Sequence, residues 1–211
     1  MAILALMNRL AGYLYLFVLC VALSSCRSAD DNSTKTVFNL NLDEGLTSLD
    51  PAFCRNRNTI WMDNQLYNGL VQLNDSLHTI PAIAKNWDIS ADGLIYIFHL
   101  RNDVFFHDDA HFKGGIGRKV TATDFAYSFS RLIDPKVASS GSWIFSDKIT
   151  GKEAFEAVND STFRITLKQP FAPFISMLTA QYCSVVPHEV VEFYGKDFRS
   201  HPIGTGPFKF K

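Results

Sequence analysis

The apolar pattern of this chain changes its period several times, and this limits the possible folds more than any other feature. Apolar and polar residues alternate over 94–100 and again over 162–168, which is the two-residue period of half-buried strands. After Thr121, apolar residues such as Phe125 and Phe129 recur at the spacing of one helix face. Strand-type and helix-type segments are interspersed irregularly, without a repeat of solenoid period. The sequence therefore predicts a mixed α and β fold.

Capping and turn residues divide the chain further. Thr121 and Asp124 have the spacing of a capping box, and Pro135 would end the helix that they begin. We expect Asn58 to cap another helix, which ends before Gly69. A turn at 90–93 separates two strands. The other expected helices are 152–157, 174–179 and 189–194. The other expected strands are 36–42, 70–73, 104–107, 184–186 and one beginning at Phe208.

The composition is that of a globular protein. Of the 211 residues, 47% are hydrophobic and 19% are charged, so the chain can bury a sizeable core. The net charge is only −1, and no run of Lys or Arg stands out. Because phosphate backbones are bound by clustered positive charge, we expect no nucleic acid partner.

The first 26 residues have the pattern of an export signal. The apolar run 10–22 is too short for a comfortable membrane span and has the length of a signal-peptide core. The run Leu23-Ser24-Ser25-Cys26 follows it and resembles the lipobox of bacterial lipoproteins. We therefore expect 1–26 to be a lipoprotein signal peptide, Cys26 to be lipidated, and 27–35 to be a polar tether. A plain signal peptide cut near Ser25 and an uncleaved anchor are the alternatives.

Two cysteines remain after this leader. Export into an oxidising compartment would allow Cys54 and Cys183 to pair. Their separation in sequence does not show whether they are close in space. A disulfide and two buried or cleft-lining thiols both stay open.

The sequence contains no complete catalytic motif of the kinds considered next. Gly151-Lys152 is followed by Glu153, where a phosphate-binding loop needs Ser or Thr. The segment 188–192 begins like a zinc-protease helix but has Glu192 in place of the second histidine. No G-x-S-x-G nucleophile elbow occurs. We therefore expect a protein that is not an enzyme and that uses no cofactor.

One polar cluster is a weak candidate for a metal site. His107 and His111 lie within five positions of each other, with Asp108 and Asp109 between them. Nothing in the segment fixes their geometry, so a solvated polar loop is the favoured interpretation.

Many short phrases, in their order and spacing, resemble the family 5 extracellular solute-binding proteins. This family includes the oligopeptide-, dipeptide- and nickel-binding receptors of ABC importers. The phrases are LDPA at 49–52, LYNGLV at 66–71, PAIAKNW at 81–87, SADGL at 90–94, YIFHLR at 96–101, FHD at 106–108, TATDFAYSF at 121–129, RLIDP at 131–135, TFRITL at 162–167, PFAPF at 170–174, VP at 186–187 and GTGPF at 204–208. Their order and spacing extend over nearly the whole stretch from Leu49 to Phe208.

The resemblance implies a periplasmic-binding-protein-like fold of type II, cluster C. The segments 36–66 and 188–211 would form part of the first lobe, and 67–187 would be a subdomain inserted into it. Family members are much longer and place a second lobe after this point. The chain stops inside the expected strand at Phe208, which agrees with a fold that continues.

The resemblance also implies a function. The protein would capture peptides or similar small solutes on the periplasmic face of the cell envelope and deliver them to an ABC transporter permease. It would be a monomer, held at the membrane by its lipid anchor. The alternative is a metal- or metallophore-binding protein (nickel-type) of the same fold.

Candidate ligand contacts follow from relatives, in which the stretches after 49–51 and after Leu178 line the cleft. We add Trp143, because aromatic residues often form the walls of ligand pockets and its surroundings are loop-like. Two guanidinium groups after 49–51 would favour a carboxylate-bearing ligand, unless both are surface charges. The candidates are Cys54, Arg55, Arg57, Asn58, Trp143, Gln181 and Tyr182.

The sequence departs from the family at one place. The segment 109–120 is longer and richer in glycine than the corresponding family loop. It is interpreted as a surface insertion, because the cost of loop closure grows slowly with length. This departure weakens the case for His107 and His111 as ligand-binding residues.

Overall fold

A computed structural model of the protein describes residues 39–43 and 45–211, and its compact unit runs from Leu42 to Lys211. The expected signal peptide 1–26, the expected lipidation site Cys26 and the expected tether 27–35 lie outside the described residues. Among the helices of the described part, none has the length and hydrophobicity that crossing a bilayer requires.

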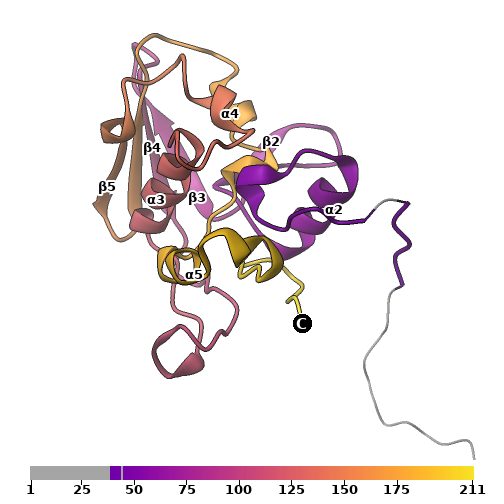
Figure 1. Ribbon diagram of the computed structural model, residues 1–211. Coiled ribbons are helices and arrows are strands. Elements are labelled where there is room, and N and C mark those ends of the chain that lie inside the picture. Colours follow the sequence, from indigo (N-terminus) through magenta and orange to yellow (C-terminus); the bar gives the residue numbers. More distant parts are fainter. Residues whose placement is uncertain (1–38, 44) are drawn as a thin grey trace, which may run out of the picture. The chain divides into compact units, whose positions relative to one another are not determined.

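The central feature is a four-stranded antiparallel sheet with the order β3-β4-β6-β5 (Figure 1). Gly93 has φ +71°, which is the conformation that the turn between β3 and β4 needs and that only glycine adopts without strain. The alternation in β4 places Tyr96, Phe98 and Leu100 in the core. The strands are β3 (Ala84–Ile89), β4 (Ile95–Leu100), β5 (Phe155–Asn159) and β6 (Thr162–Thr166).

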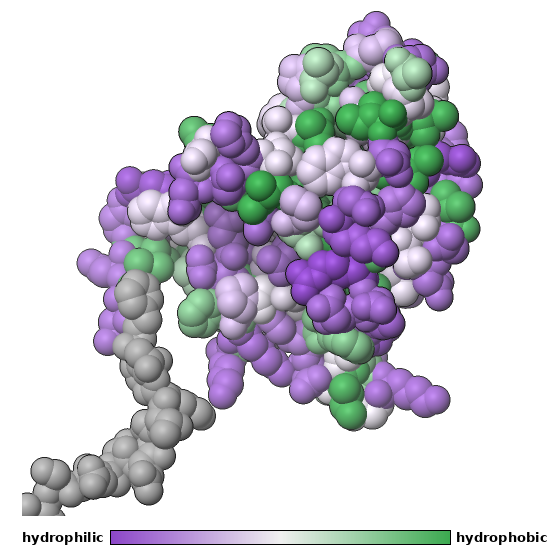
Figure 2. Space-filling model, turned by 180° about the vertical axis from the view of Figure 1, so that it is seen from behind, coloured by the Kyte–Doolittle hydropathy of each residue, from purple (hydrophilic) through white to green (hydrophobic). Residues whose placement is uncertain are grey.

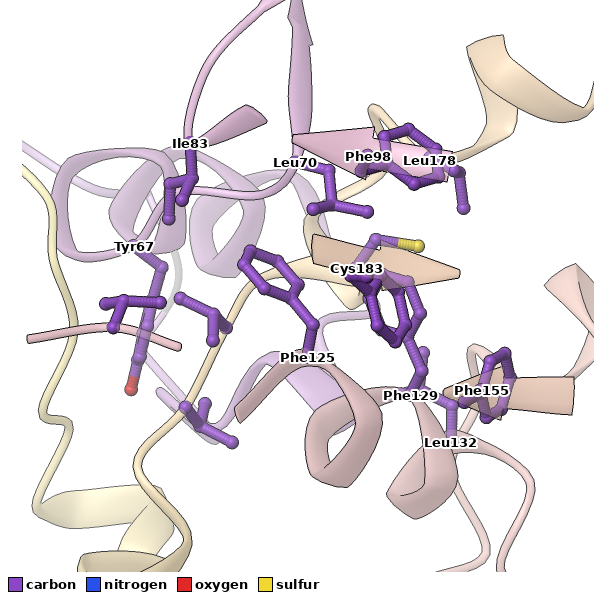
Figure 3. Close-up of a cluster of buried hydrophobic side chains, with 14 of the residues drawn as sticks. Tyr67, Leu70, Ile83, Phe98, Phe125, Phe129, Leu132, Phe155, Leu178 and Cys183 are labelled. Carbon is purple, nitrogen blue, oxygen red and sulfur yellow. The ribbon is translucent and has the colours of Figure 1, made fainter. Parts of the chain in front are cut away.

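Helix α3 (Ala122–Leu132) packs on one face of this sheet. The side chain of Asp124 accepts the Thr121 backbone N–H at 2.9 Å, which satisfies one of the free donors at the helix start. Figure 3 shows Phe125, Phe129 and Leu132 pointing from α3 toward the strands. The ring of Phe129 has four aromatic neighbours with centroids within 5.9 Å, namely Phe125, Phe145, Phe155 and Phe163.

The remaining elements are short. A two-stranded sheet of β1 (Val71–Leu73) and β2 (Thr79–Pro81) lies next to helix α2 (Arg57–Leu66) in the chain. Short 3-10 turns connect the elements. The other helices and turns are η1 (Pro51–Phe53), η2 (Lys113–Gly115), η3 (Ser142–Ile144), η4 (Lys152–Ala154), α4 (Phe174–Met177), η5 (Gln181–Cys183), α5 (His188–Tyr194) and η6 (Gly195–Ser200).

On the face seen from behind the view of Figure 1, the surface has both hydrophilic and apolar residues. Figure 2 shows hydrophilic residues in the middle of this face, with apolar residues scattered among them. Exposed apolar side chains such as Leu77, Ile89 and Phe105 come from different loops and strands. Singly exposed apolar residues of this kind are common on soluble proteins.

The sequence predicted most of these elements. The helix begun by Thr121, the strands at 94–100 and 162–168, and the turn between β3 and β4 are confirmed. The short helices after Phe174 and before Gly195 are also confirmed, and Gly195 has φ +54° at the end of α5. These elements have local signals that agree with their tertiary surroundings.

The expected helix 152–157 is wrong. Lys152–Ala154 form a single 3-10 turn, and Phe155 begins strand β5. Phe155 pairs with Ile165 of β6, and its ring lies 4.9 Å from that of Phe145. The hydrogen bonds of the sheet and the burial of this ring outweigh helix propensity over so short a segment.

The predicted helix cap is also wrong by two residues. Asn56, not Asn58, caps α2, because its Oδ1 accepts the Thr59 N–H at 2.9 Å. Asn58 is instead buried in the first turn, where its Nδ2 donates to Asp43 at 2.9 Å.

Several expected strands do not form, because their pairing with other segments is absent or limited to isolated bridges. Of the expected strand 36–42, residues 36–38 lie outside the described part of the chain, and residues 39–42 form no strand with any described segment. The segments 104–107 and 184–186 contribute only one bridge each, from Phe105 and Ser184. Phe208 donates one backbone bond to Gln65 without entering a sheet. A strand forms only where a second chain segment completes its hydrogen bonds.

We predict that Phe129→Ala lowers the free energy of unfolding by about 3 to 5 kcal/mol, because it opens a cavity among four aromatic rings. Urea unfolding followed by circular dichroism measures this loss. Ile116→Ala, at a side chain that is 69% exposed, is the matched control and should change stability by less than about 0.5 kcal/mol. Equal losses for the two variants would contradict the described core.

Candidate functional site

The fold brings together three chain segments that carry predicted site residues. Ser139 Oγ donates to the carbonyl of Ala52 at 2.6 Å, which ties the loop before η3 to η1. A Cβ on Gly141 would lie 2.5 Å from the ring of Tyr182, so only glycine allows this close approach. Residues 52–57, 139–143 and 181–183 therefore lie next to one another.

We call the solvent-facing part of these segments the candidate surface, made of Arg55, Arg57, Trp143, Gln181 and Tyr182. Arg55 and Arg57 are exposed, and the side chain of Trp143 is 55% exposed. Gln181 and Tyr182 are half-buried. An exposed indole beside cationic and amide groups can contact a ligand through both its apolar face and hydrogen bonds.

Two members of the candidate surface have partners within the protein. The Arg57 guanidinium binds Asp43 at 2.8 Å and lies 5.0 Å from the ring centroid of Trp61. Gln181 Nε2 donates to Asn64 Oδ1 at 2.7 Å. Arg55 belongs to none of the ion pairs formed within the described residues.

Cys54 and Asn58 lie beneath this surface. Cys54 is 1% exposed and Asn58 is 3% exposed. Cys54 and Cys183 are both free thiols, and burial raises the pKa of each. A thiol that stays protonated is a poor nucleophile, so these cysteines serve as small packing residues in this structure.

A buried ion pair holds the loop that carries Cys54 and Arg55. The guanidinium of Arg131 binds both oxygens of Asp50, at 3.1 and 2.7 Å. The same carboxylate accepts the backbone N–H of Ala52 at 3.0 Å and so begins η1. Two parallel charge-assisted bonds of this kind fix both direction and distance. The loop is thereby positioned on α3.

A second buried carboxyl lies directly below the loop. Asp63 is fully buried on α2, and among the described residues only the Cys54 thiol comes close to donating a hydrogen bond to its carboxyl oxygens. Burial raises the pKa of Asp63 to about 7, while the neighbouring Cys54 thiol lowers it and the charge of Asp50 raises it. Near neutral pH this carboxyl is therefore partly protonated.

The imidazoles of His107 and His111 have different partners within the protein. His107 Nε2 donates to the carbonyl of Gly206 at 2.7 Å, whereas His111 Nδ1 contacts Asp109 at 2.6 Å. The metal-like group found among the described residues consists instead of Asp124, His188 and Glu189.

That acidic group already has its cation. Arg118 Nη2 lies 2.6 Å from Asp124 Oδ1 and 2.7 Å from Glu189 Oε2. The guanidinium supplies the positive charge that a metal would supply, and it ties the glycine-rich loop to α3 and α5. This arrangement gives no support to the metal-binding alternative.

Sequence reasoning missed Arg131, Asp63 and Ser139. A signal existed for Asp63, because Thr59, Asp63 and Tyr67 recur every four residues and so share one helix face. Nothing in the sequence indicated that Arg131 would meet Asp50, 81 positions earlier.

Comparison with known proteins identifies the family of this chain. The profile of a family described as "Bacterial extracellular solute-binding proteins, family 5 Middle" matches residues 78–211. Over 159 residues, or 69% of this chain, the sequence is 36% identical to di/tripeptide-binding protein 2 of Pseudomonas aeruginosa. It is also 36% identical, over 159 residues or 69% of this chain, to heme-binding protein A of Haemophilus influenzae. The chain spans about 29% of the length of each of these relatives.

Solved structures show the same fold. Listeria monocytogenes OppA bound to peptide matches with a TM-score of 0.75 and 25% identity, over 85% of this chain and 36% of that chain. Helicobacter pylori DppA in complex with the peptide STSA matches with a TM-score of 0.68 and 32% identity, over 78% of this chain and 34% of that chain. The predicted periplasmic-binding-protein-like fold is confirmed.

We predict that Arg131→Met destabilises the protein by about 3 to 5 kcal/mol, because it leaves the carboxylate of Asp50 buried without its cation. Adding Asp50→Asn should restore part of the loss, since the uncompensated charge is then removed. Urea unfolding of both variants measures the effect. Arg164→Met, which breaks the exposed pair with Glu156, should cost about 1 kcal/mol or less. No recovery in the double variant would contradict this account.

The raised pKa of Asp63 predicts a pH-dependent stability. The folded protein keeps a proton that the unfolded chain releases above the ordinary aspartate pKa of 3.8, so stability falls as pH rises from about 4 to about 7 and stays low above that. Asp63→Asn removes this dependence. The free energy of unfolding of Asp63→Asn minus that of the wild type should therefore increase by up to about 4 kcal/mol between pH 4 and pH 8.

Urea unfolding at these two pH values measures the Asp63 effect. Asp75→Asn, at an exposed turn residue, is the control and should show no such rise. A difference between Asp63→Asn and wild type that is the same at both pH values would refute the assignment of a titrating buried carboxyl.

Proposed function

Since this chain belongs to the bacterial extracellular solute-binding proteins of family 5, we propose that it is the first part of a receptor that captures peptides outside the cytoplasmic membrane for an ABC importer. The observation that carries the proposal is the candidate surface, combined with similarity to proteins named for binding di- and tripeptides and to structures with bound peptide. The family consists of solute-binding proteins, so catalysis is not part of the proposal.

We propose that 36–66 and 188–211 form part of the first lobe and that 67–187 is a subdomain inserted into it. Backbone hydrogen bonds join the two proposed halves of the lobe, which supports this division. They run from Leu49 N–H to the Arg199 carbonyl at 2.8 Å, from Gly206 N–H to the Leu66 carbonyl at 2.8 Å, and from Phe208 N–H to the Gln65 carbonyl at 3.0 Å.

The candidate surface would form one wall of the ligand site. In the proposed mechanism, Trp143 and Tyr182 contact the apolar parts of the ligand, while Gln181 and the arginines bind its polar groups. Cys54 and Asn58 hold the loop from beneath. A second lobe then closes over the ligand, and binding favours the closed state because the ligand contacts both lobes only there.

The arginines give the proposed site a charge preference. Arg55 is exposed and has no ion-pair partner within the described residues, whereas Arg57 is already paired with Asp43. A ligand with a carboxylate near Arg55 would gain a charge-assisted hydrogen bond. We therefore propose a preference for acidic over basic peptides.

The location of the receptor belongs to the same proposal. The family description places its members outside the cytoplasm. We propose that Cys26 carries a lipid, that 27–35 is the tether, and that the monomeric receptor works on the periplasmic face beside its permease. The spacing of the apolar run and the Leu-Ser-Ser-Cys sequence supports this arrangement.

Isothermal titration of the complete gene product with alanine tripeptides that carry Glu, Ala or Lys tests the proposal. We expect saturable binding, tightest for the acidic peptide, and about tenfold weaker binding after Trp143→Ala. Phe105→Ala is a matched control, because Phe105 is an aromatic residue that is 53% exposed and is not part of the candidate surface. Absence of peptide binding would refute the function, and a preference for the basic peptide would refute the role of Arg55.

A further inference from the structure

A cavity outside the candidate surface lies between three segments that are distant in the sequence. Its volume is about 390 Å³, which is within the range of small-molecule sites. Phe53 lines it from η1, Tyr127 and Val137 from α3 and the loop that follows, and Lys196 and Arg199 from η6.

The cavity has a strong excess of positive charge. Five cationic and two anionic side chains line it. Both carboxylates are already neutralised, Asp50 by Arg131 at 2.7 Å and Asp134 by Lys152 at 2.7 Å. The other three cations, Lys136, Lys196 and Arg199, belong to none of the ion pairs within the described residues. Their charge is therefore available to a ligand, and the walls of a cavity concentrate its field.

The cavity also offers an apolar wall and a neutral donor. The guanidinium of Arg199 lies 3.8 Å from the ring centroid of Phe53, which holds this arginine at the cavity. Val137 and Val191 add aliphatic surface. The hydroxyl of Tyr127 has no hydrogen-bond partner in the part of the chain that the structure describes, so it can donate to a ligand oxygen.

We propose that this cavity binds a small organic anion whose carboxylate or phosphate lies among Lys136, Lys196 and Arg199 and whose apolar body lies against Phe53 and Val137. The site is separate from the candidate surface, because none of Arg55, Arg57, Trp143, Gln181 and Tyr182 lines the cavity. Its ligand does not depend on the proposed peptide function.

A competing explanation for the cations is helix stabilisation. Helix α3 ends at Leu132 and α5 ends at Tyr194, and cations near helix C-termini are favourable. This explanation accounts for Lys136 and Lys196, but it predicts no saturable anion binding. The two explanations therefore differ in a measurable way.

Phenyl phosphate is the probe, and two-dimensional NMR titration of the protein is the measurement. We expect saturable binding with shifts at the backbone amides of Lys136, Val137 and Lys196. Phenol, which lacks the anion, and inorganic phosphate, which lacks the apolar body, should each bind at least about tenfold more weakly. Added salt should weaken phenyl phosphate binding, since the cations are exposed.

The double variant Lys136→Gln/Lys196→Gln should weaken phenyl phosphate binding by about tenfold. Lys85→Gln/Lys168→Gln is the matched control, because it removes the same charge from exposed lysines that do not line the cavity. The control should bind like wild type, and urea unfolding verifies that both variants fold. The proposal is overturned if the wild type shows no saturable binding, if both double variants lose affinity equally, or if the shifted amides lie elsewhere.

Discussion

The buried ion pair between Asp50 and Arg131 is the interaction on which the arrangement of the site depends. Asp50 is 2% exposed, so its charge is tolerated only with a partner of fixed geometry. Arg131 supplies that partner from the last turn of α3. Because Asp50 also begins η1, this single contact transmits the position of α3 to the loop that carries Arg55.

The aromatic core in turn fixes α3. Phe125 and Phe129 pack against Phe163 of the central sheet, so α3 cannot shift without opening a cavity. The chain leaving α3 then reaches Ser139, which bonds the carbonyl of Ala52. Sheet, helix and loop thus form one connected support beneath Trp143. Both the candidate surface and the cationic cavity are assembled around η1 and the C-terminal end of α3.

Elements were predictable from sequence where local signals and tertiary contacts agree. The capping pair Thr121 and Asp124 and the alternation of β4 are of this kind. The segment 152–157 was not predictable in the same way, because Phe155 is held in β5 by its pairing with Ile165. The cap of α2 was misplaced because Asn56 and Asn58 are equally good capping residues in isolation. Only the folded chain shows that Asn58 bonds to Asp43.

The sequence by itself determined the family, the class of fold and the set of residues from which the site was chosen. It did so because motifs, hydrophobic periods and turn residues are properties of neighbouring positions. The tertiary structure alone decided that Cys54 and Asn58 are buried while Trp143 is exposed, that the carboxyl of Asp63 is buried next to the Cys54 thiol, and that three cations outside the ion pairs of the described residues share one cavity. Burial and charge compensation depend on residues far apart in the chain, and their meeting is set by packing and not by sequence spacing.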